Sequence, residues 1–323
     1  MKAIVFTEYG SPDHLQLKEV AKPAPKDDEV LINVHASSVN SWDWEFQRGT
    51  FVNRLLFGLL KPKATKRILG ADVAGTIEAV GGKVTRFQPG DEVFGDLWDS
   101  WGGFAEYACA RESALEPKPV NLTFAESAAI PQAGVLALQG LRNAGRIQPG
   151  QKVLINGAGG GVGTFAVQLA KLTGTEVTGV DNTHKLDVVR SVGADHVIDY
   201  TQEDFTRNGQ RYDLILDCQG FRSMFDYKRA LSPGGTYAMI GGAIPRMLQA
   251  LFLGLWGSTT GRRKFRIVAE GPNKGLADLK ALIEAGKVAP VIDKTYILRD
   301  TPEAFRYFGE GRHKGKVVIT MES

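Results

Sequence analysis

The chain has 323 residues, of which 43% are hydrophobic and 23% charged, a balance typical of a globular protein with room for about two domains. Its 38 glycines follow no short period, which excludes a collagen-like chain. The formal net charge is only +3 and no basic stripe spans a domain, so we exclude a nucleic-acid-binding protein.

The amino-terminal segment, Met1–Phe6, reads as a strand and lacks the charged and apolar regions of a signal peptide. No run further along the chain reaches the roughly 18 apolar residues of a membrane-spanning helix. We therefore expect a soluble, cytoplasmic protein with no membrane partner.

The first third of the chain is predicted to be rich in β-structure. Val30–Ala36 and Thr76–Val80 alternate apolar with polar residues, and Gly90–Gly95 is a short run between turn residues. Short strands separated by glycine and proline favour a partly open barrel or a strongly curled sheet.

The pattern changes at about Thr123, where helical stretches begin to alternate with short apolar strands, as in a parallel sheet built from βαβ units. The predicted strands are Lys152–Asn156, Glu176–Val180, His196–Ile198, Asp213–Asp217 and Gly235–Ile240. The predicted helices between them are Val162–Leu172, Lys185–Val192 and Met224–Leu231.

After about Val268 the pattern is mixed again, with predicted helices at Leu276–Ala285 and Pro302–Phe308 and a closing strand at Lys316–Thr320. A parallel-sheet unit thus interrupts a β-rich one. The predicted fold is α/β, with a β-rich domain made of residues 1–123 and 268–323 and a doubly wound parallel-sheet domain made of residues 124–267.

A glycine-rich turn directly follows the first strand of the parallel unit. Residues 156–163 read Asn-Gly-Ala-Gly-Gly-Gly-Val-Gly, after a buried strand and before a helix. Such glycines let the backbone approach a pyrophosphate, and the helix amino terminus offers it free N–H groups and a partial positive charge. The turn therefore predicts a dinucleotide site rather than a plain loop. Its phosphate-binding residues would be Gly157, Gly159, Gly160, Gly161, Val162 and Gly163.

The second parallel strand is followed by Asp181, where a carboxylate accepts hydrogen bonds from adenosine ribose hydroxyls and repels a 2′-phosphate. This favours NADH. His184 and Lys185 follow closely and offer positive charge to a 2′-phosphate, which leaves NADPH open. The structural alternative is that Asp181 caps the helix that follows it, with help from Asn182 and Thr183.

Several motifs along the chain resemble the quinone-oxidoreductase branch of the medium-chain dehydrogenase/reductase superfamily. They are Met1–Val5, Ala36–Asn40, Gly70–Gly75, Gly90–Phe94, Gly102–Tyr107, the glycine turn, Gly193–Asp199 and His313–Ile319. The resemblance covers nearly the whole chain. It implies a GroES-like catalytic domain split by a Rossmann domain, in agreement with the interrupted pattern. It also implies a homodimer, and it favours NADPH, which the family commonly prefers.

The resemblance also implies further cofactor contacts. Gly315, Lys316 and Val317 would line the nicotinamide end, together with Cys218 and Gly241, which follow later strands of the sheet. Residues 132–136 would lie close to the same end. The family often has threonine where this chain has Leu136, so one hydroxyl contact to the cofactor is expected to be missing.

Ligands for a catalytic zinc are missing at the positions that the resemblance implies. Zinc-dependent relatives need thiolate and imidazole ligands around an open coordination position. Here residues 39–43 read Val-Asn-Ser-Trp-Asp, and Gly-Ala-Asp at 70–72 stands where those enzymes have histidine followed by glutamate. The two cysteines, Cys109 and Cys218, are too few for a four-cysteine lobe, and the five histidines are dispersed. We therefore predict no metal site.

Without a metal to stabilise an alkoxide, the remaining chemistry is direct hydride transfer to an electrophilic acceptor, such as a quinone or an α,β-unsaturated carbonyl. The predicted catalytic residues are Asn40, which would contact the carbonyl or position the nicotinamide ribose, and Asp43 and Arg48, which would complete a polar network. The structural alternatives are a turn residue for Asn40 and a plain ion pair for Asp43 with Arg48. Related enoyl-thioester reductases use a tyrosine near the position of Thr50 and Phe51, and neither of these two residues can donate a proton in that way. Water is therefore the expected proton source.

Two apolar stretches that continue into basic residues, 51–67 and 244–264, fit packing against a partner subunit, a lid over a substrate pocket, or an amphipathic membrane contact. Three functions stay open: a NAD(P)H-dependent quinone or enone reductase, an enoyl-thioester reductase, and a nucleotide-binding protein without turnover. The missing tyrosine counts against the second, and the first is favoured, with a small hydrophobic carbonyl or quinone compound as substrate.

Overall fold

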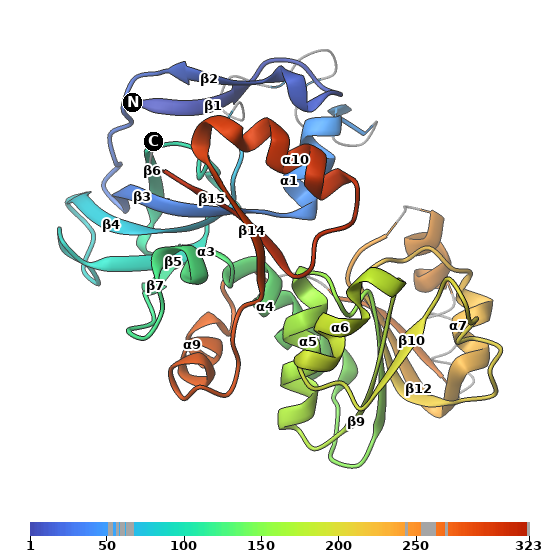
Figure 1. Cartoon of the computed structure of the whole chain (residues 1–323). Coiled ribbons are helices and arrows are strands. Elements are labelled where there is room, and N and C mark those ends of the chain that lie inside the picture. Colours follow the sequence, from blue (N-terminus) through green and yellow to red (C-terminus); the bar gives the residue numbers. More distant parts are fainter. Residues whose placement is uncertain are drawn as a thin grey trace. The chain divides into compact units, whose positions relative to one another are not determined.

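The computed structural model describes residues 1–50, 54–55, 58, 62, 68–242, 245–252, 263–268 and 271–321. The chain forms two compact units, each made of more than one segment of the chain (Figure 1). Unit 1 contains Met1–Gln132, Pro272–Lys280 and Pro290–Ser323, and unit 2 contains Ala133–Gly271 and Ala281–Ala289. The units thus change over after Gln132, whereas the sequence patterns place a boundary at Thr123. The roles assigned to the two domains stay predictions.

Unit 1 is built on a sheet to which the described residues contribute seven strands, in the order β14-β15-β3-β4-β5-β7 with β6 paired to β3. The central strand is β3, which pairs with β4 along one edge and with β6 and then β15 along the other. A separate pair joins β1 to β2. The strands of unit 1 are β1 (Lys2–Phe6), β2 (Leu15–Glu19), β3 (Glu29–Val39), β4 (Asp72–Val80), β5 (Glu92–Asp96), β6 (Tyr107–Arg111), β7 (Leu115–Pro117), β14 (Ile292–Ile297) and β15 (Lys316–Thr320).

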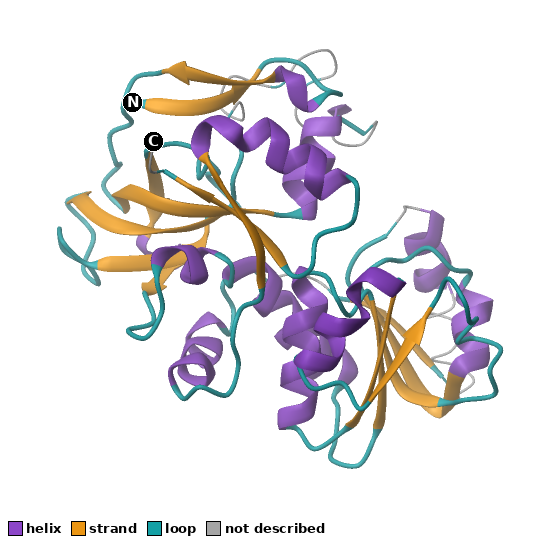
Figure 2. Cartoon of the chain, viewed as in Figure 1, coloured by secondary structure: helices purple, strands orange, loops and turns teal. Residues whose placement is uncertain are grey.

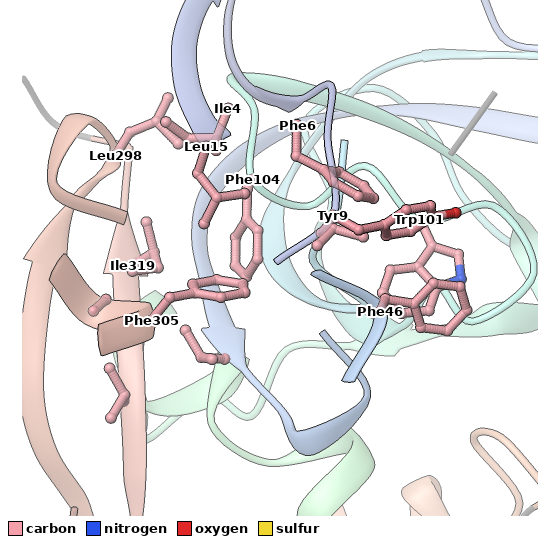
Figure 3. Packing of buried hydrophobic residues seen from close by; sticks show 14 residues of the cluster. Ile4, Phe6, Tyr9, Leu15, Phe46, Trp101, Phe104, Leu298, Phe305 and Ile319 are labelled. Atoms are coloured by element: carbon pink, nitrogen blue, oxygen red, sulfur yellow. The ribbon is translucent and has the colours of Figure 1, made fainter. Parts of the chain in front are cut away.

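Two helices of unit 1, α1 (Ser41–Arg48) and α10 (Thr301–Gly309), contribute to a hydrophobic core together with β15. A further helix, α3 (Phe124–Ala128), contacts β3 and β4. Phe46 of α1, Phe305 of α10 and Ile319 of β15 belong to one cluster, in which the rings of Phe104 and Phe305 meet edge to face with centroids 5.7 Å apart (Figure 3). Burying each such side chain stabilises the fold by about 1.5–3 kcal/mol. This core holds α1 and β15 in place.

Unit 2 is a parallel sheet whose described strands have the order β10-β9-β8-β11-β12-β13. Numbered along the chain, this order is 3-2-1-4-5-6, that of the doubly wound dinucleotide-binding fold. Helices α5 and α6 lie on one side of the sheet and α7 on the other (Figures 1 and 2). The strands are β8 (Lys152–Asn156), β9 (Glu176–Asp181), β10 (His196–Asp199), β11 (Tyr212–Asp217), β12 (Leu231–Met239) and β13 (Lys264–Ile267). The helices are α5 (Gly161–Leu172), α6 (Leu186–Ser191) and α7 (Met224–Ala230).

The burial of β8 explains why its sequence is a continuous apolar run. Val153, Leu154 and Ile155 are all fully buried, because helices cover both faces of the parallel sheet. Two further helices, α4 (Pro131–Gln139) and α9 (Leu276–Glu284), contain the positions at which the chain passes from one unit to the other.

The predicted α/β class is confirmed, and most predicted elements lie within a few residues of the observed ones. The predicted strand at Gly235–Ile240 instead begins at Leu231, because the strand continues through the Pro-Gly-Gly segment, where Gly234 has a φ of 81° and the register against β11 shifts. Strands β2, β6, β7, β13 and β14 were not predicted. No residue of β14 is fully buried, and its sequence shows no clear alternation of apolar and polar residues.

Most of the apolar and basic segment 51–67, and part of 244–264, lie outside the described residues. Residues 245–252 are helical. Met247 and Ala250 pack against the core of unit 2, whereas Leu248 and Leu251 are exposed. Among the helices that the structure describes, none is long and apolar enough to cross a membrane.

Candidate functional site

A cluster of buried polar side chains forms where three strands of unit 1 meet. The pairing of β3 with β4 sets Ser38 opposite Asp72. The pairing of β15 with the end of β3 brings Lys316 to Asn40, although 276 residues separate the two. Asp72 is 0% exposed, Lys316 3% and Asn40 6%, so the cluster lies inside the unit.

Asp72 is the common acceptor of this cluster. Its Oδ2 accepts hydrogen bonds from Ser38 Oγ at 2.8 Å, Asn40 Nδ2 at 2.9 Å and Lys316 Nζ at 3.3 Å. Its Oδ1 accepts one from the backbone N–H of Gln132 at 2.9 Å. A buried carboxylate is tolerated when it is both paired and hydrogen-bonded, and Asp72 meets both conditions.

The side-chain amide of Asn40 is engaged on both sides within the cluster. Its Nδ2 donates to Asp72 and, at 3.4 Å, to the carbonyl oxygen of Ser38, while its Oδ1 accepts from Lys316 Nζ. The sequence predicts that Asn40 contacts an acceptor carbonyl or positions the nicotinamide ribose. The geometry favours a different role, in which Asn40 fixes the position of the Lys316 ammonium.

Asp43 and Arg48 are not joined in the structure. Asp43 is fully buried, its Oδ2 accepts from the backbone N–H of Asn40 at 2.8 Å, and its Oδ1 accepts from that of Gly70 at 2.9 Å. Arg48 is exposed, and its guanidinium lies 5.7 Å from the centre of the Trp44 ring. Five positions apart on α1, the two side chains point in different directions. Asp43 therefore anchors the start of α1 to the segment before β4, and the predicted network with Arg48 does not form.

The pKa of Asp43 is raised from its ordinary 3.8 to about 7, mainly by burial. The nearby charge of Asp72 contributes to the rise, and the two backbone donors and Lys316 partly offset it. Desolvation outweighs these donors because the carboxyl group has no contact with water. Asp43 thus changes its charge near neutral pH.

The cluster does not fit a zinc ion. It offers neither thiolate nor imidazole, and the Lys316 ammonium already compensates the charge of Asp72. Across the part of the chain that the structure describes, no group of three or more histidine, cysteine, aspartate or glutamate side chains is placed to hold a metal ion. Cys109 and Cys218 are free thiols, and burial raises the pKa of both.

In unit 2, the glycine turn leads from β8 into α5, with Gly160 as the residue before the helix. Gly157 has a φ of 84°, a conformation that favours glycine. A Cβ on Gly159 would lie 2.6 Å from the Cβ of Lys185, and one on Gly163 would lie 2.1 Å from the carbonyl oxygen of Gly157. The first N–H groups of α5, from Gly161 onward, have no acceptor within the helix. The turn therefore fits a pyrophosphate.

Asp181 braces this turn from the end of β9. Its Oδ2 accepts a hydrogen bond from the backbone N–H of Gly159 at 2.8 Å, and its Oδ1 accepts one from that of Asn182 at 2.9 Å. Asn182, rather than Asp181, caps the following helical turn by accepting from the N–H of His184. Lys185 is 5% exposed and packs against Gly159, so opposite charges flank the turn.

Sequence reasoning missed a second polar network, which joins the carboxyl ends of β8 and β11. Asn156 Nδ2 donates to Asp217 Oδ1 at 2.8 Å, and Tyr237 donates to Asp217 Oδ2 at 2.7 Å. Burial and the charge of Asp217 raise the pKa of Tyr237. The strand order reverses at these two strands, which is where ligands of doubly wound sheets bind. The sequence does show a polar residue at the end of each of these two apolar strands, which could have indicated the network.

Other predicted cofactor residues lie at the ends of strands. The backbone N–H of Cys218 donates to the carbonyl oxygen of Asn156 at 3.0 Å. Gly241 packs against the loop after β11, because a Cβ on Gly220 in that loop would lie 2.5 Å from the carbonyl oxygen of Gly241. Both therefore lie at the same edge of the sheet as the glycine turn.

In unit 1, Gly315 forms the turn before β15 with a φ of 78°. The side chain of Val317, the second residue of β15, is fully buried in the core of the unit. Of Gly315, Lys316 and Val317, only Lys316 brings a polar side chain to the buried cluster.

Comparison with known proteins gives consistent matches. The model of the alcohol dehydrogenase GroES-like domain matches residues 26–120, and that of the zinc-binding dehydrogenase matches residues 192–319. The chain is 35% identical to the 2-methylene-furan-3-one reductase of Solanum lycopersicum, over 99% of this chain and 79% of the relative. It is 34% identical to the chloroplastic quinone-oxidoreductase QR1 of Triphysaria versicolor, over 99% and 98%.

A solved structure supports the same assignment. The quinone oxidoreductase from Coxiella burnetii has a TM-score of 0.87 and 28% identity, over 100% of this chain and 99% of that one. The predicted GroES-like domain is confirmed by the first family model, and the relatives match along almost the entire chain. The chain belongs to the quinone-oxidoreductase branch of the medium-chain dehydrogenase/reductase superfamily.

Proposed function

We propose that the chain is a NAD(P)H-dependent reductase that transfers a hydride to a quinone or an α,β-unsaturated carbonyl compound without a metal. The observation that carries this proposal is the buried cluster of Asn40, Asp72 and Lys316. In it the ammonium of Lys316 pairs with the carboxylate of Asp72, in the region where zinc-dependent relatives have a zinc ligand. The names of the relatives, a furanone reductase and a quinone oxidoreductase, support the same chemistry.

In this proposal the nicotinamide cofactor supplies the hydride, and the protein binds and orients it. The glycine turn, with Gly157, Gly159, Gly160, Gly161, Val162 and Gly163, holds the pyrophosphate. Asp181 and Lys185 face the adenosine ribose, and Cys218, Gly241 and the start of β15 at Gly315, Lys316 and Val317 line the nicotinamide end. NADH and NADPH both remain in the proposal, because opposite charges flank the turn.

Lys316 provides the electrostatic part of the proposed reaction. When the hydride adds to the β-carbon of an enone, its electron pair forms the new C–H bond and the π electrons move to the carbonyl oxygen. A fixed positive charge stabilises this developing negative charge. Asp72 and Asn40 hold Lys316 in place, while a proton from water completes the product. A quinone takes up one hydride and one proton to give the hydroquinone.

Two finer features belong to the proposal on the strength of the sequence and its resemblance. They are a homodimer and a cytoplasmic location. Dimerisation is checked by the mass of the purified chain in light scattering, where a monomer at micromolar concentration contradicts it.

The experiment that tests the function is a panel assay. The purified chain is mixed with NADPH or NADH and with quinones, alkenals, enones and enoyl thioesters, and the loss of reduced nicotinamide absorbance is followed. We expect turnover with at least one quinone or enone, and a loss of turnover in Lys316→Met. Nucleotide binding without turnover across the panel overturns the proposal in favour of a non-catalytic role, and turnover with enoyl thioesters alone favours that reductase class.

A further inference from the structure

One amide donor beside the Asp72 cluster has no hydrogen-bond partner among the described residues. Gln132, in the first turn of α4, donates its backbone N–H to Asp72 Oδ1 at 2.9 Å, and only 2% of the residue is exposed. Its side-chain Nε2 is buried and has no hydrogen-bond acceptor among the residues that the structure describes. A buried donor left unpaired costs free energy, and native proteins keep few of them.

No acceptor within the described part of the chain forms a hydrogen bond with Gln132 Nε2. The oxygens of Asp72 already receive hydrogen bonds from Ser38, Asn40, Lys316 and the backbone of Gln132 itself. The Asn40 oxygen receives one from Lys316. An acceptor that arrives with a ligand would satisfy the amide, and a neutral N–H donor suits an oxygen that carries no hydrogen of its own.

From this we infer that Gln132 is a ligand-binding residue, whose side-chain amide donates a hydrogen bond to a carbonyl oxygen of a bound reactant. The inference rests on the proposed function, and it names two sources of that oxygen: the acceptor carbonyl and the carboxamide of the nicotinamide. In the first case the hydrogen bond strengthens as negative charge develops on the oxygen, so Gln132 contributes to the reaction rate. In the second it contributes to cofactor binding.

Substitution by methionine separates this role from a structural one. Gln132→Met removes the donor at nearly constant length and leaves the backbone hydrogen bond to Asp72 in place. Loss of an unpaired buried amide should raise the urea midpoint of unfolding, whereas loss of a ligand contact should lower activity. We therefore expect a variant that is more stable and less active, with one kinetic or binding constant weakened about tenfold or more.

Gln47 provides the matched control. It lies on α1, is fully buried, and both its Nε2 and its Oε1 have no partner among the described residues. No hydrogen bond links its side chain to Asp72 or Lys316 within the described part of the chain. Gln47→Met should also raise the urea midpoint, and it should leave cofactor binding and turnover unchanged.

The measurements are urea unfolding, fluorescence titration with NADPH and NADH, and steady-state kinetics with phenanthrenequinone and an aliphatic enone. If the cofactor binds about ten times more weakly and the KM of the acceptor is unchanged, the partner of Gln132 is the carboxamide. If kcat/KM for the acceptor falls and cofactor binding is unchanged, the partner is the acceptor carbonyl. Gln132→Leu repeats the series if the methionine variant does not fold.

Unchanged binding and kinetics in Gln132 variants overturn the inference, as does a fall in stability that accounts for the lost activity. If the wild-type chain shows no turnover, the proposed function fails separately, and the cofactor titration then decides on Gln132 alone.

Discussion

Lys316 and Asp72 form an ion pair with 3.3 Å between Nζ and Oδ2, and their side chains are 3% and 0% exposed. The two residues come from β15 and β4, which do not pair with each other and are both neighbours of β3. Removing one member of such a pair leaves the other buried and uncompensated.

Lys316→Met should therefore destabilise the chain by about 3–5 kcal/mol. Asp72→Asn removes the charge that Lys316 compensates, so the double variant should cost less than the sum of the single ones, with an interaction energy of about 0.5–3 kcal/mol. Urea unfolding of the four proteins measures this energy. Strict additivity would show that the pair is not coupled.

The raised pKa of Asp43 makes stability depend on pH. Below about pH 3 the carboxyl group is protonated in both the folded and the unfolded chain. As the pH rises to about 7, the unfolded chain ionises while the folded one, with its pKa at about 7, stays protonated, so stability falls by about 3–4 kcal/mol.

Asp43→Asn should remove this pH-dependent loss, at a constant cost of about 1 kcal/mol for a weakened backbone hydrogen bond. The check is the free energy of unfolding of both proteins at about pH 5 and about pH 7.5, where the wild type loses stability and the variant loses less. Equal losses in the two proteins would place the pKa of Asp43 in its ordinary range.

The charge of Asp181 should set the choice between NADH and NADPH. Asp181→Asn keeps an oxygen for the N–H of Gly159 and removes the charge that repels a 2′-phosphate. We expect the ratio of dissociation constants to shift at least about tenfold toward NADPH. Lys185→Met removes a positive charge instead, and it should shift the ratio of dissociation constants toward NADH. Unchanged ratios in both variants would mean that neither side chain meets the ribose.

Chelation should leave activity intact. Because the Asp72 cluster pairs its carboxylate with an ammonium and has no thiolate or imidazole, dialysis against EDTA or phenanthroline should not change turnover. Metal analysis of the dialysed protein provides the control. Loss of activity that added Zn²⁺ restores would show a metal requirement.

The parts of the fold that follow from contiguous residues could be predicted from sequence. Strand β8, the glycine turn and α5 lie between Lys152 and Leu172, and their apolar pattern and glycines are readable in one stretch. Strand β14 was missed because none of its residues is fully buried and its sequence lacks a regular pattern. Strand β13, with basic residues alternating with apolar ones, is short and lies at the edge of the sheet.

The contacts of the candidate sites depend on strand register, which the sequence pattern does not reveal. Lys316 and Asp72 are 244 residues apart and meet because β15 and β4 flank β3. Asp181 was predicted to bind ribose or to cap a helix, and its hydrogen bond to Gly159 follows from the pairing of β9 with β8. The pairing of Asp43 with Arg48 was inferred from nearness in sequence, which on a helix does not imply that side chains meet.

Hydride transfer from the nicotinamide to carbon is the central claim, and isotope transfer tests it most directly. The chain is incubated with an enone and with NADPH or NADH that carries deuterium at the transferable position of nicotinamide C4, in ordinary water, and the product is examined by mass spectrometry and NMR. We predict one deuterium at the β-carbon of the saturated ketone and none at the α-carbon, which takes its hydrogen from water. A reduced product without deuterium at the β-carbon, or no product although the cofactor binds, would contradict the account.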